Sequence, residues 1–87
     1  MTYSVHLSKV ALKQMSKISR RELIKIGERI DDLSKNPRPH DVKKIKGSLD
    51  LYRIRSGSYR ILYRIVDDVL CILIVDVDHR KDIYKNL

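Results

Sequence analysis

The stretch "LYRIRSGSYRILYRI", residues 51–65, combines a strong strand pattern with a dense group of cations. Apolar residues occupy nearly every other position, and only Ser56, Gly57 and Ser58 interrupt the alternation. A period of two is typical of a β-strand with one buried face, and a short break containing glycine is typical of a hairpin turn. The stretch therefore predicts a β-hairpin, with strands at about residues 49–55 and 58–66.

The sequence on either side of this hairpin predicts two further strands. Residues 69–77 follow an acidic turn and contain the run "VLCILIV", which is apolar on both parities. Such a run is typical of a central strand that is covered on both faces. Residues 3–7 predict a short strand near the N-terminus. The hairpin and residues 69–77 together predict an antiparallel meander.

Two amphipathic helices are predicted between the N-terminal strand and the meander. Ser8 is a suitable N-cap for the first helix. Ser19 and Glu22 have the spacing of a capping box at the start of the second helix, and the "NPRP" segment at 36–39 ends it. Gly27, in the second helix, indicates a position where another helix packs closely. The apolar stripe of this helix comprises Leu23, Ile24, Ile26, Ile30 and Leu33.

These elements predict one α+β domain over residues 1–87, with a helical hairpin packed on one face of the sheet. The chain carries 19 Lys and Arg against 11 Asp and Glu, a net charge of +8, which indicates an anionic partner. Cys71 is the only cysteine, so an internal disulfide is excluded. The sequence shows no stretch of membrane-spanning length and no signal peptide, so we expect a cytoplasmic protein without a membrane partner.

Strand parity predicts that the arginines of the hairpin lie on one side of the sheet. Arg53 and Arg55 share a face, and Arg60 and Arg64 share a face on the next strand. These arginines could bind phosphate, because a guanidinium group matches phosphate oxygens in a bidentate manner. Alternatively, they could form a solvated sheet face whose charge discourages edge pairing. Residues 43–64 hold seven Lys or Arg and one acid, and the candidate RNA-binding residues among them are Lys43, Lys44, Lys46, Arg53, Arg55 and Arg64.

A titratable group, a fixed cation and a phenol follow in the segment "HRKDIY", as His79, Arg80 and Tyr84. Such a set could cut RNA without a metal, because the reaction needs a base for the 2′-OH, cations for the charged phosphate and an acid for the leaving oxygen. Histidine is the natural proton carrier, since arginine stays protonated. A polar residue closing a strand and a tyrosine at the core edge are the structural alternatives. Asp76 and Asp78 beside His79 also allow a metal site, which the strongly positive surroundings disfavour.

The combination of "KKIKG", "LYRIRSGSYRILYRI" and "HRKDIY" resembles the RelE branch of the RelE/ParE superfamily of toxins from toxin–antitoxin systems, over nearly the whole chain. The resemblance implies a RelE-like fold and a ribosome-dependent mRNA endonuclease that cuts in the A site. It implies attack by the RNA's own 2′-OH without metal or cofactor. It also implies mRNA, the ribosome and a cognate antitoxin as partners. The cationic face favours an acidic antitoxin segment that folds on binding.

The resemblance also implies roles for individual residues. Arg60 matches the phosphate-stabilising arginine, Arg80 the arginine that assists the leaving group, and Tyr84 the tyrosine that stacks on or orients the base. With the histidine proposed from its chemistry, the predicted catalytic set is Arg60, His79, Arg80 and Tyr84, with no metal.

This sequence departs from the best-known member of the family at three positions. Arg53 and Arg55 stand where that member has lysines, and Lys46 stands where it has an arginine. A lysine can lose its proton in a crowded or buried site, whereas an arginine does not. We therefore hypothesise that His79 transfers the proton and that the two arginines only bind and activate the RNA.

Two other functions are compatible with the same sequence. Proteins of the ParE branch resemble RelE in fold but poison DNA gyrase and cut nothing, and they generally lack the complete catalytic set. A non-catalytic nucleic-acid-binding module would use the same basic face and would show salt-sensitive binding without strand scission. Gyrase-dependent DNA breaks with intact mRNA would favour the ParE function.

Overall fold

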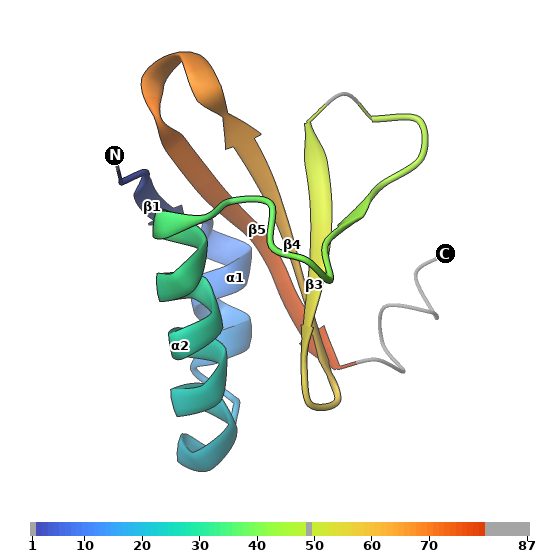
Figure 1. Ribbon diagram of the computed structural model, residues 1–87. Coiled ribbons are helices and arrows are strands. Elements are labelled where there is room, and N and C mark those ends of the chain that lie inside the picture. Colours follow the sequence, from blue (N-terminus) through green and yellow to red (C-terminus); the bar gives the residue numbers. More distant parts are fainter. Residues whose placement is uncertain (1, 49, 80–87) are drawn as a thin grey trace.

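The computed structural model describes residues 2–48 and 50–79, which fold into two helices and a five-stranded sheet (Figure 1). A short 3-10 turn at Asp67–Val69 precedes the last strand. The helices are α1 (Lys9–Met15) and α2 (Arg20–Lys35), and the strands are β1 (Ser4–Leu7), β2 (Lys43–Lys44), β3 (Leu51–Ser56), β4 (Tyr59–Val66) and β5 (Cys71–His79).

The predicted antiparallel meander is present as β3, β4 and β5, in a sheet of order β1-β5-β4-β3-β2. Strand β1 pairs with β5 in parallel, and the two-residue β2 adds an edge next to β3 that the sequence did not predict. The last strand starts and ends two residues later than predicted. Its start is delayed because the 3-10 turn occupies Asp67–Val69 and its C-cap, Leu70, has a left-handed φ of 49°.

Both helices cover one face of the sheet, as predicted, with α1 against β5 and α2 against β1 and β3 (Figure 1). The core between them holds mainly aliphatic side chains and two tyrosines, Tyr52 and Tyr63. The apolar stripe of α2 is narrower than predicted, because Ile24 is 53% exposed. From α2, the buried residues are Ile26, Ile30 and Leu33.

No helix among the described residues is long and apolar enough to cross a membrane.

A β-bulge changes the inward-facing side of β5 partway along the strand. Leu62 pairs with Asp76 and Tyr63 with Ile74, so Val75 has no opposite residue on β4. An extra residue in one strand shifts the alternation of the residues that follow. The buried positions of β5 accordingly change from Ile72 and Ile74 to Val77. The bulge therefore decides which side of the sheet the last residues of β5 face.

Beyond the end of β1, side chains of α1 and of its N-cap provide hydrogen-bond partners for β5. The Ser8 hydroxyl donates to the carbonyl oxygen of Val75 at 2.8 Å. The Gln14 side chain accepts from the backbone N–H of Val77 at 2.7 Å and donates to the Asp76 carboxylate. A single glutamine thus holds two neighbouring residues of the bulged segment, just before the end of the strand.

The two predicted helix caps differ in outcome. Ser8 is the N-cap of α1, as predicted, and its hydroxyl accepts from the backbone N–H of Ala11 at 3.0 Å. Ser19 occupies the N-cap position of α2 but its side chain makes no capping hydrogen bond, so the predicted capping box is wrong. Glu22 instead reaches toward the β3–β4 turn, where its carboxylate lies 3.3 Å from the position that a Cβ on Gly57 would take.

The predicted close helix contact at Gly27 is also wrong, and this leads to a stability prediction. A Cβ built on Gly27 meets no atom within 4 Å. Replacing an exposed helical glycine by alanine removes backbone freedom from the unfolded chain without a clash. We expect Gly27→Ala to raise the free energy of unfolding by about 0.5–1 kcal/mol in urea melts.

Gly57 provides the matched control for this substitution. Its φ is +59°, and a Cβ there approaches Glu22. An alanine at such a position is strained, so Gly57→Ala should lower the urea midpoint. Equal effects of the two substitutions would contradict this account of Gly27.

At the opposite end of the sheet, Arg38 joins the segment after α2 to the β4–β5 connection. Its guanidinium pairs with the Asp67 carboxylate at 2.9 Å and lies 5.3 Å from the centre of the Tyr52 ring. The Tyr3 hydroxyl donates to the same carboxylate at 2.6 Å. These hydrogen bonds from Arg38 and Tyr3 hold the pKa of Asp67 below its usual value, and the bond to Asp67 raises the pKa of Tyr3.

The lowered pKa of Asp67 predicts an acid-sensitive contribution to stability. A carboxyl whose folded-state pKa is depressed stabilises the fold above its unfolded pKa of about 3.9, and this contribution is lost as pH falls through the folded value. We expect Asp67→Asn to be less stable than the unchanged protein at pH 7, with the difference shrinking below about pH 4. Urea midpoints at pH 7, 5 and 3 measure it. A difference independent of pH would contradict the assignment.

Candidate functional site

The arginines of the central hairpin form what we call the arginine face, defined as Arg53, Arg55 and Arg60. Their positions on β3 and β4 alternate with buried positions that point toward the helices, so the three side chains lie on the other side of the sheet. Arg55 is directly opposite Arg60 in the antiparallel pairing. The prediction that the hairpin arginines lie on one side of the sheet is confirmed, and it includes Arg64, which has the parity of Arg60.

The surroundings of Arg60 differ from a solvated sheet face. The side chain is only 2% exposed, with Arg55 opposite it on β3 and Asp78 opposite it on β5. The acid across one strand is a favourable cross-strand neighbour, whereas the like charge across the other is unfavourable. A buried charge is stable only where partners compensate its lost hydration. This burial fixes Arg60 more firmly than the sequence pattern predicted.

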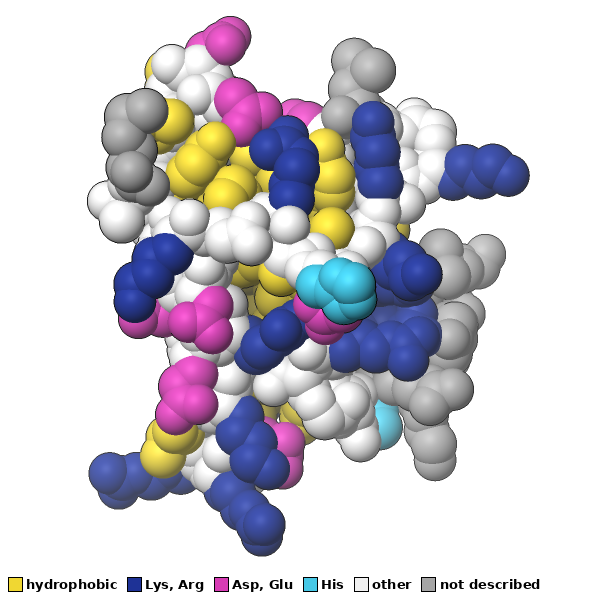
Figure 2. Space-filling view, in the orientation of Figure 1, with side chains coloured by type: hydrophobic (Ala, Val, Ile, Leu, Met, Phe, Trp, Pro, Cys, Tyr) yellow, Lys and Arg dark blue, Asp and Glu magenta, His cyan; other side chains and the backbone are white. Residues whose placement is uncertain are grey.

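Two hollows lie along the arginine face. Lys43, Arg53 and Arg55 line a hollow of about 260 Å³, together with Asp41 and Ile54. Arg55 and Arg60 line a smaller one of about 70 Å³ at the β3–β4 turn. In the space-filling view, several Lys and Arg side chains lie on the side of the molecule where β3 lies in Figure 1 (Figure 2). The cations therefore border hollows that an anion could enter.

Three of the predicted RNA-binding cations are not part of the arginine face. Lys44 pairs with Tyr52 and therefore has the other parity from Lys43, although it is exposed. Lys46 lies in the turn after β2 and is exposed. Arg64 has the parity of Arg60, but its guanidinium forms an ion pair with Asp50 at 2.6 Å.

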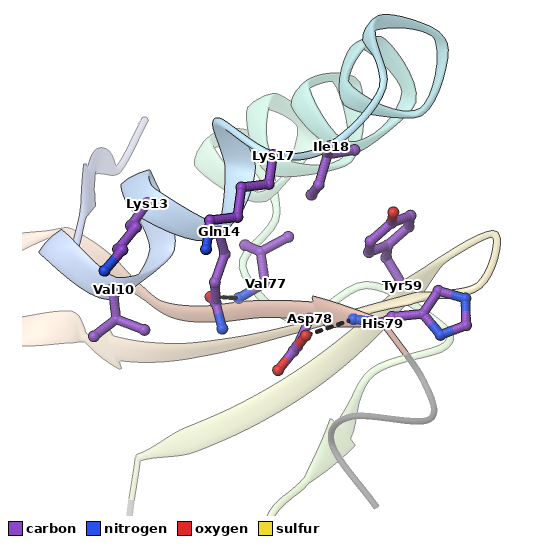
Figure 3. A pocket seen from close by; sticks show the side chains of 9 residues that line it. All are labelled: Val10, Lys13, Gln14, Lys17, Ile18, Tyr59, Val77, Asp78 and His79. Atoms are coloured by element: carbon purple, nitrogen blue, oxygen red, sulfur yellow. Dashed lines mark hydrogen bonds between the residues drawn. The ribbon is translucent and has the colours of Figure 1, made fainter.

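His79 lies at the end of β5, on the other side of the strand from Asp78. Asp78 is paired with Arg60, whereas His79 is paired with Tyr59, and the two rings meet edge to face at 5.5 Å between centroids. His79 lines a hollow beside α1, on the helix side of the sheet (Figure 3). The structure thus places His79 around the end of β5 from the arginine face rather than upon it.

Arg80 and Tyr84 lie outside the described residues, so their predicted roles stay predictions. The Asp78 carboxylate accepts the backbone N–H of His79 at 2.9 Å. Within residues 2–48 and 50–79, no group of three or more His, Cys, Asp or Glu is arranged to hold a metal ion.

The sequence allowed Asp76 or Asp78 to pair with a neighbouring arginine, but it did not identify Asp78 as the residue opposite Arg60. The register of the β4–β5 pair brings them together, and that register contains the bulge. Extending the pairing outward from the acidic turn without a bulge gives a different partner for Arg60. The only signal in the sequence was an acid near the end of the last strand.

The chain is similar to toxins over almost its whole length. Residues 5–84 match the family described as the ParE toxin of the type II toxin-antitoxin system parDE. Toxin RelG of Mycobacterium tuberculosis is 34% identical over 86 residues, which cover 98% of this chain and 99% of that protein.

Solved structures of toxin–antitoxin complexes share the fold. The archaeal RelE–RelB complex from Pyrococcus horikoshii matches with a TM-score of 0.82 and 32% identity, over 92% of this chain and 97% of the matched chain. The RelBE2 complex from Mycobacterium tuberculosis matches with a TM-score of 0.81 and 32% identity, over 92% and 100%. The resemblance seen in the sequence is thereby confirmed. This chain belongs to the RelE/ParE family, as a RelE-like toxin of the type II toxin–antitoxin class.

Proposed function

We propose that this toxin is an endoribonuclease that cuts mRNA in the ribosomal A site, by attack of a 2′-OH on the adjacent phosphate. The observation that supports this most is the position of Arg60, held between Arg55 and Asp78 and bordering a hollow at the β3–β4 turn. Two opposed guanidinium groups repel each other, and a phosphate between or beside them would relieve that repulsion.

The proposed reaction requires stabilisation of negative charge at the phosphate. The pentacoordinate transition state carries more negative charge than the RNA phosphate in the ground state. Donors that are already fixed stabilise such charge without reorganising during the reaction. In this proposal Arg60 supplies the fixed donors, and Asp78 opposite it keeps the guanidinium oriented.

The RNA backbone would run along the arginine face. Lys43, Arg53 and Arg55 border the larger hollow and would bind phosphates on one side of the cut. Binding of this kind weakens steeply with salt, because each phosphate contact releases counterions. Lys44, Lys46 and Arg64 would contribute to the overall attraction rather than to the central contacts.

Proton transfer is assigned to His79 in this proposal. Its position at the end of β5 requires the attacking 2′-OH to lie beyond the edge of the arginine face, near the strand end. Arg80 would assist the leaving 5′ oxygen and Tyr84 would stack on or orient a base, as the family resemblance implies.

The test is to express the protein briefly in a translating extract and to map mRNA ends by primer extension. Cuts inside codons that appear only during translation are expected. Intact mRNA would overturn the proposal.

A second function has one specific observation in its favour, because the matching family model is described as the ParE toxin. A ParE-like protein would poison DNA gyrase and leave RNA intact. Gyrase-dependent cleavage of plasmid DNA by the purified toxin, together with intact mRNA in the extract, would establish that function instead.

We also propose a cognate antitoxin as partner. The matched structures from Pyrococcus horikoshii and Mycobacterium tuberculosis are complexes of those toxins with antitoxins. The cationic surface over residues 43–64 would attract an acidic segment that folds as it binds. Such a segment would cover the arginine face and displace the C-terminal residues.

Charge reversal tests this contact. We expect Arg53→Glu/Arg55→Glu to weaken binding of the cognate antitoxin by about 100-fold or more, since buried interfacial charge pairs contribute strongly. Titration calorimetry with the purified antitoxin measures the change. The control is Arg20→Glu/Arg21→Glu, which alters net charge equally at two exposed positions of α2. Equal affinities of the two double variants would contradict the predicted contact.

A further inference from the structure

A hollow of about 390 Å³ lies on the helix side of the sheet, where β5 ends (Figure 3). Its volume is within the range of roughly 300–1,000 Å³ that is usual for small-ligand sites. The side chains of α1 stand on one side of it, the rings of Tyr59 and His79 on the other, and Val77 between them. Its lining residues are Val10, Lys13, Gln14, Lys17, Ile18, Tyr59, Val77, Asp78 and His79.

The lining offers an apolar surface next to an aromatic pair. Val77 is buried at the base, Ile18 is partly buried, and Val10 is 58% exposed on α1. Tyr59 and His79 meet edge to face, so their rings are not stacked on each other. A planar heteroaromatic group could pack against such a ring and against the aliphatic side chains.

The lining of the hollow carries two lysines and one acid, Asp78. Lys13 on α1 and Lys17 just beyond its end are four residues apart, and both are exposed. Neither takes part in an ion pair within the described part of the chain. Like charges at this spacing on a helical turn repel each other, and lysine binds phosphate as a point charge. The neighbouring hollow shares Tyr59 and His79 and adds Lys25 and Glu22.

We propose that this hollow binds one nucleotide of the RNA, with its base against Tyr59 and the apolar lining and its phosphate between Lys13 and Lys17. The inference rests on the proposed function, because it makes the substrate strand continue from the arginine face past His79 to the helix side of the sheet. The Gln14 amide is already bonded to Val77 and Asp76, so recognition here comes from stacking and charge. The hollow therefore adds affinity with little base preference.

The first test uses fluorescein-labelled, 2′-O-methylated oligoribonucleotides, which have no free 2′-OH and cannot be cut by the proposed reaction. We expect Lys13→Glu/Lys17→Glu to weaken binding on the order of tenfold at low salt in fluorescence anisotropy. The plot of log K against log salt should become shallower by about 0.7 for each phosphate that the variant no longer neutralises. The matched control is Lys9→Glu/Lys35→Glu, which changes net charge equally at exposed positions outside the hollow. Equal weakening by both variants would overturn the proposal.

A second measurement locates the site directly. Titration of the toxin with adenosine 5′-monophosphate should shift the backbone amide signals of Val77 and Tyr59, and the shifts should vanish in Lys13→Glu/Lys17→Glu. Shifts confined to Arg53, Arg55 and Arg60 would overturn it. So would a loss of affinity for the cognate antitoxin, but not for RNA, in the lysine variant, because the hollow would then be a protein-binding site.

The two proposals fail in different ways. If the toxin cuts mRNA in the extract while the lysine variant and its control bind RNA alike, only the nucleotide site is wrong. If mRNA stays intact while the monophosphate shifts Val77 and Tyr59, the hollow is a nucleotide site and the endonuclease proposal is wrong.

Discussion

Arg60→Ala should lower the rate of mRNA cleavage in a translating extract by about 100- to 1,000-fold, the usual effect of removing one fixed donor from a charged transition state. Arg60 is 2% exposed and lies opposite both Arg55 and Asp78, so its side chain is already confined by its neighbours before RNA arrives. A flexible lysine on the surface would lose more side-chain conformational entropy than Arg60 on binding the phosphate. Primer extension of a reporter mRNA, with time points after addition of the toxin, measures the rate.

Three further variants separate chemistry from folding in this experiment. Arg60→Lys keeps the charge but lacks the planar fork, so its rate should lie between those of the unchanged protein and Arg60→Ala. Asp78→Asn removes the acid opposite Arg60 and should reduce cleavage by a smaller factor. Arg21→Ala, at an exposed position of α2, controls for the loss of a positive charge. Wild-type cleavage by a folded Arg60→Ala protein, with a normal thermal melt, would contradict the role of Arg60.

The path from sequence to fold was clearest where a single local rule applied. The alternation through residues 51–65 predicted the hairpin and its buried face, because side-chain direction in a strand depends only on parity. The turn is shorter than predicted, since Ser56 ends β3 and pairs with Tyr59. Helix α2 was equally clear from its 3.6-residue stripe. Gly27 and Ile24 were misjudged, because whether a helical position faces solvent or another element depends on packing that a local pattern does not contain.

The candidate site was predictable up to the β-bulge. Arg53, Arg55 and Arg60 share a face by parity alone. Uninterrupted alternation from the buried Ile74 would have turned His79 toward that same face. The extra residue at Val75 reverses this, and it depends on how β5 fits against β4 and α1, which sequence periodicity does not record. The burial of Arg60 likewise depends on cross-strand partners that become known only with the register.

His79→Gln should keep RNA binding and lose about 100- to 10,000-fold in cleavage, the range that general acid–base groups contribute. Glutamine preserves size and polarity near Tyr59 but cannot take up a proton at neutral pH. Anisotropy with uncleavable RNA measures binding, and primer extension in the extract measures cleavage. His40→Gln is the control, because His40 is exposed in the segment after α2 and lines none of the hollows described above.

The position of His79 makes this experiment decisive for the geometry of the reaction. Because its ring lies around the end of β5 from Arg60, it can serve the same phosphate only if the RNA bends past the strand end. A His79→Ala protein that cuts at the normal rate would show that the RNA stays on the arginine face, and that a different group takes the 2′-OH proton. Loss of cleavage with intact binding would instead place the 2′-OH beside His79. The nucleotide site between α1 and Tyr59 would then lie directly along the path of the RNA.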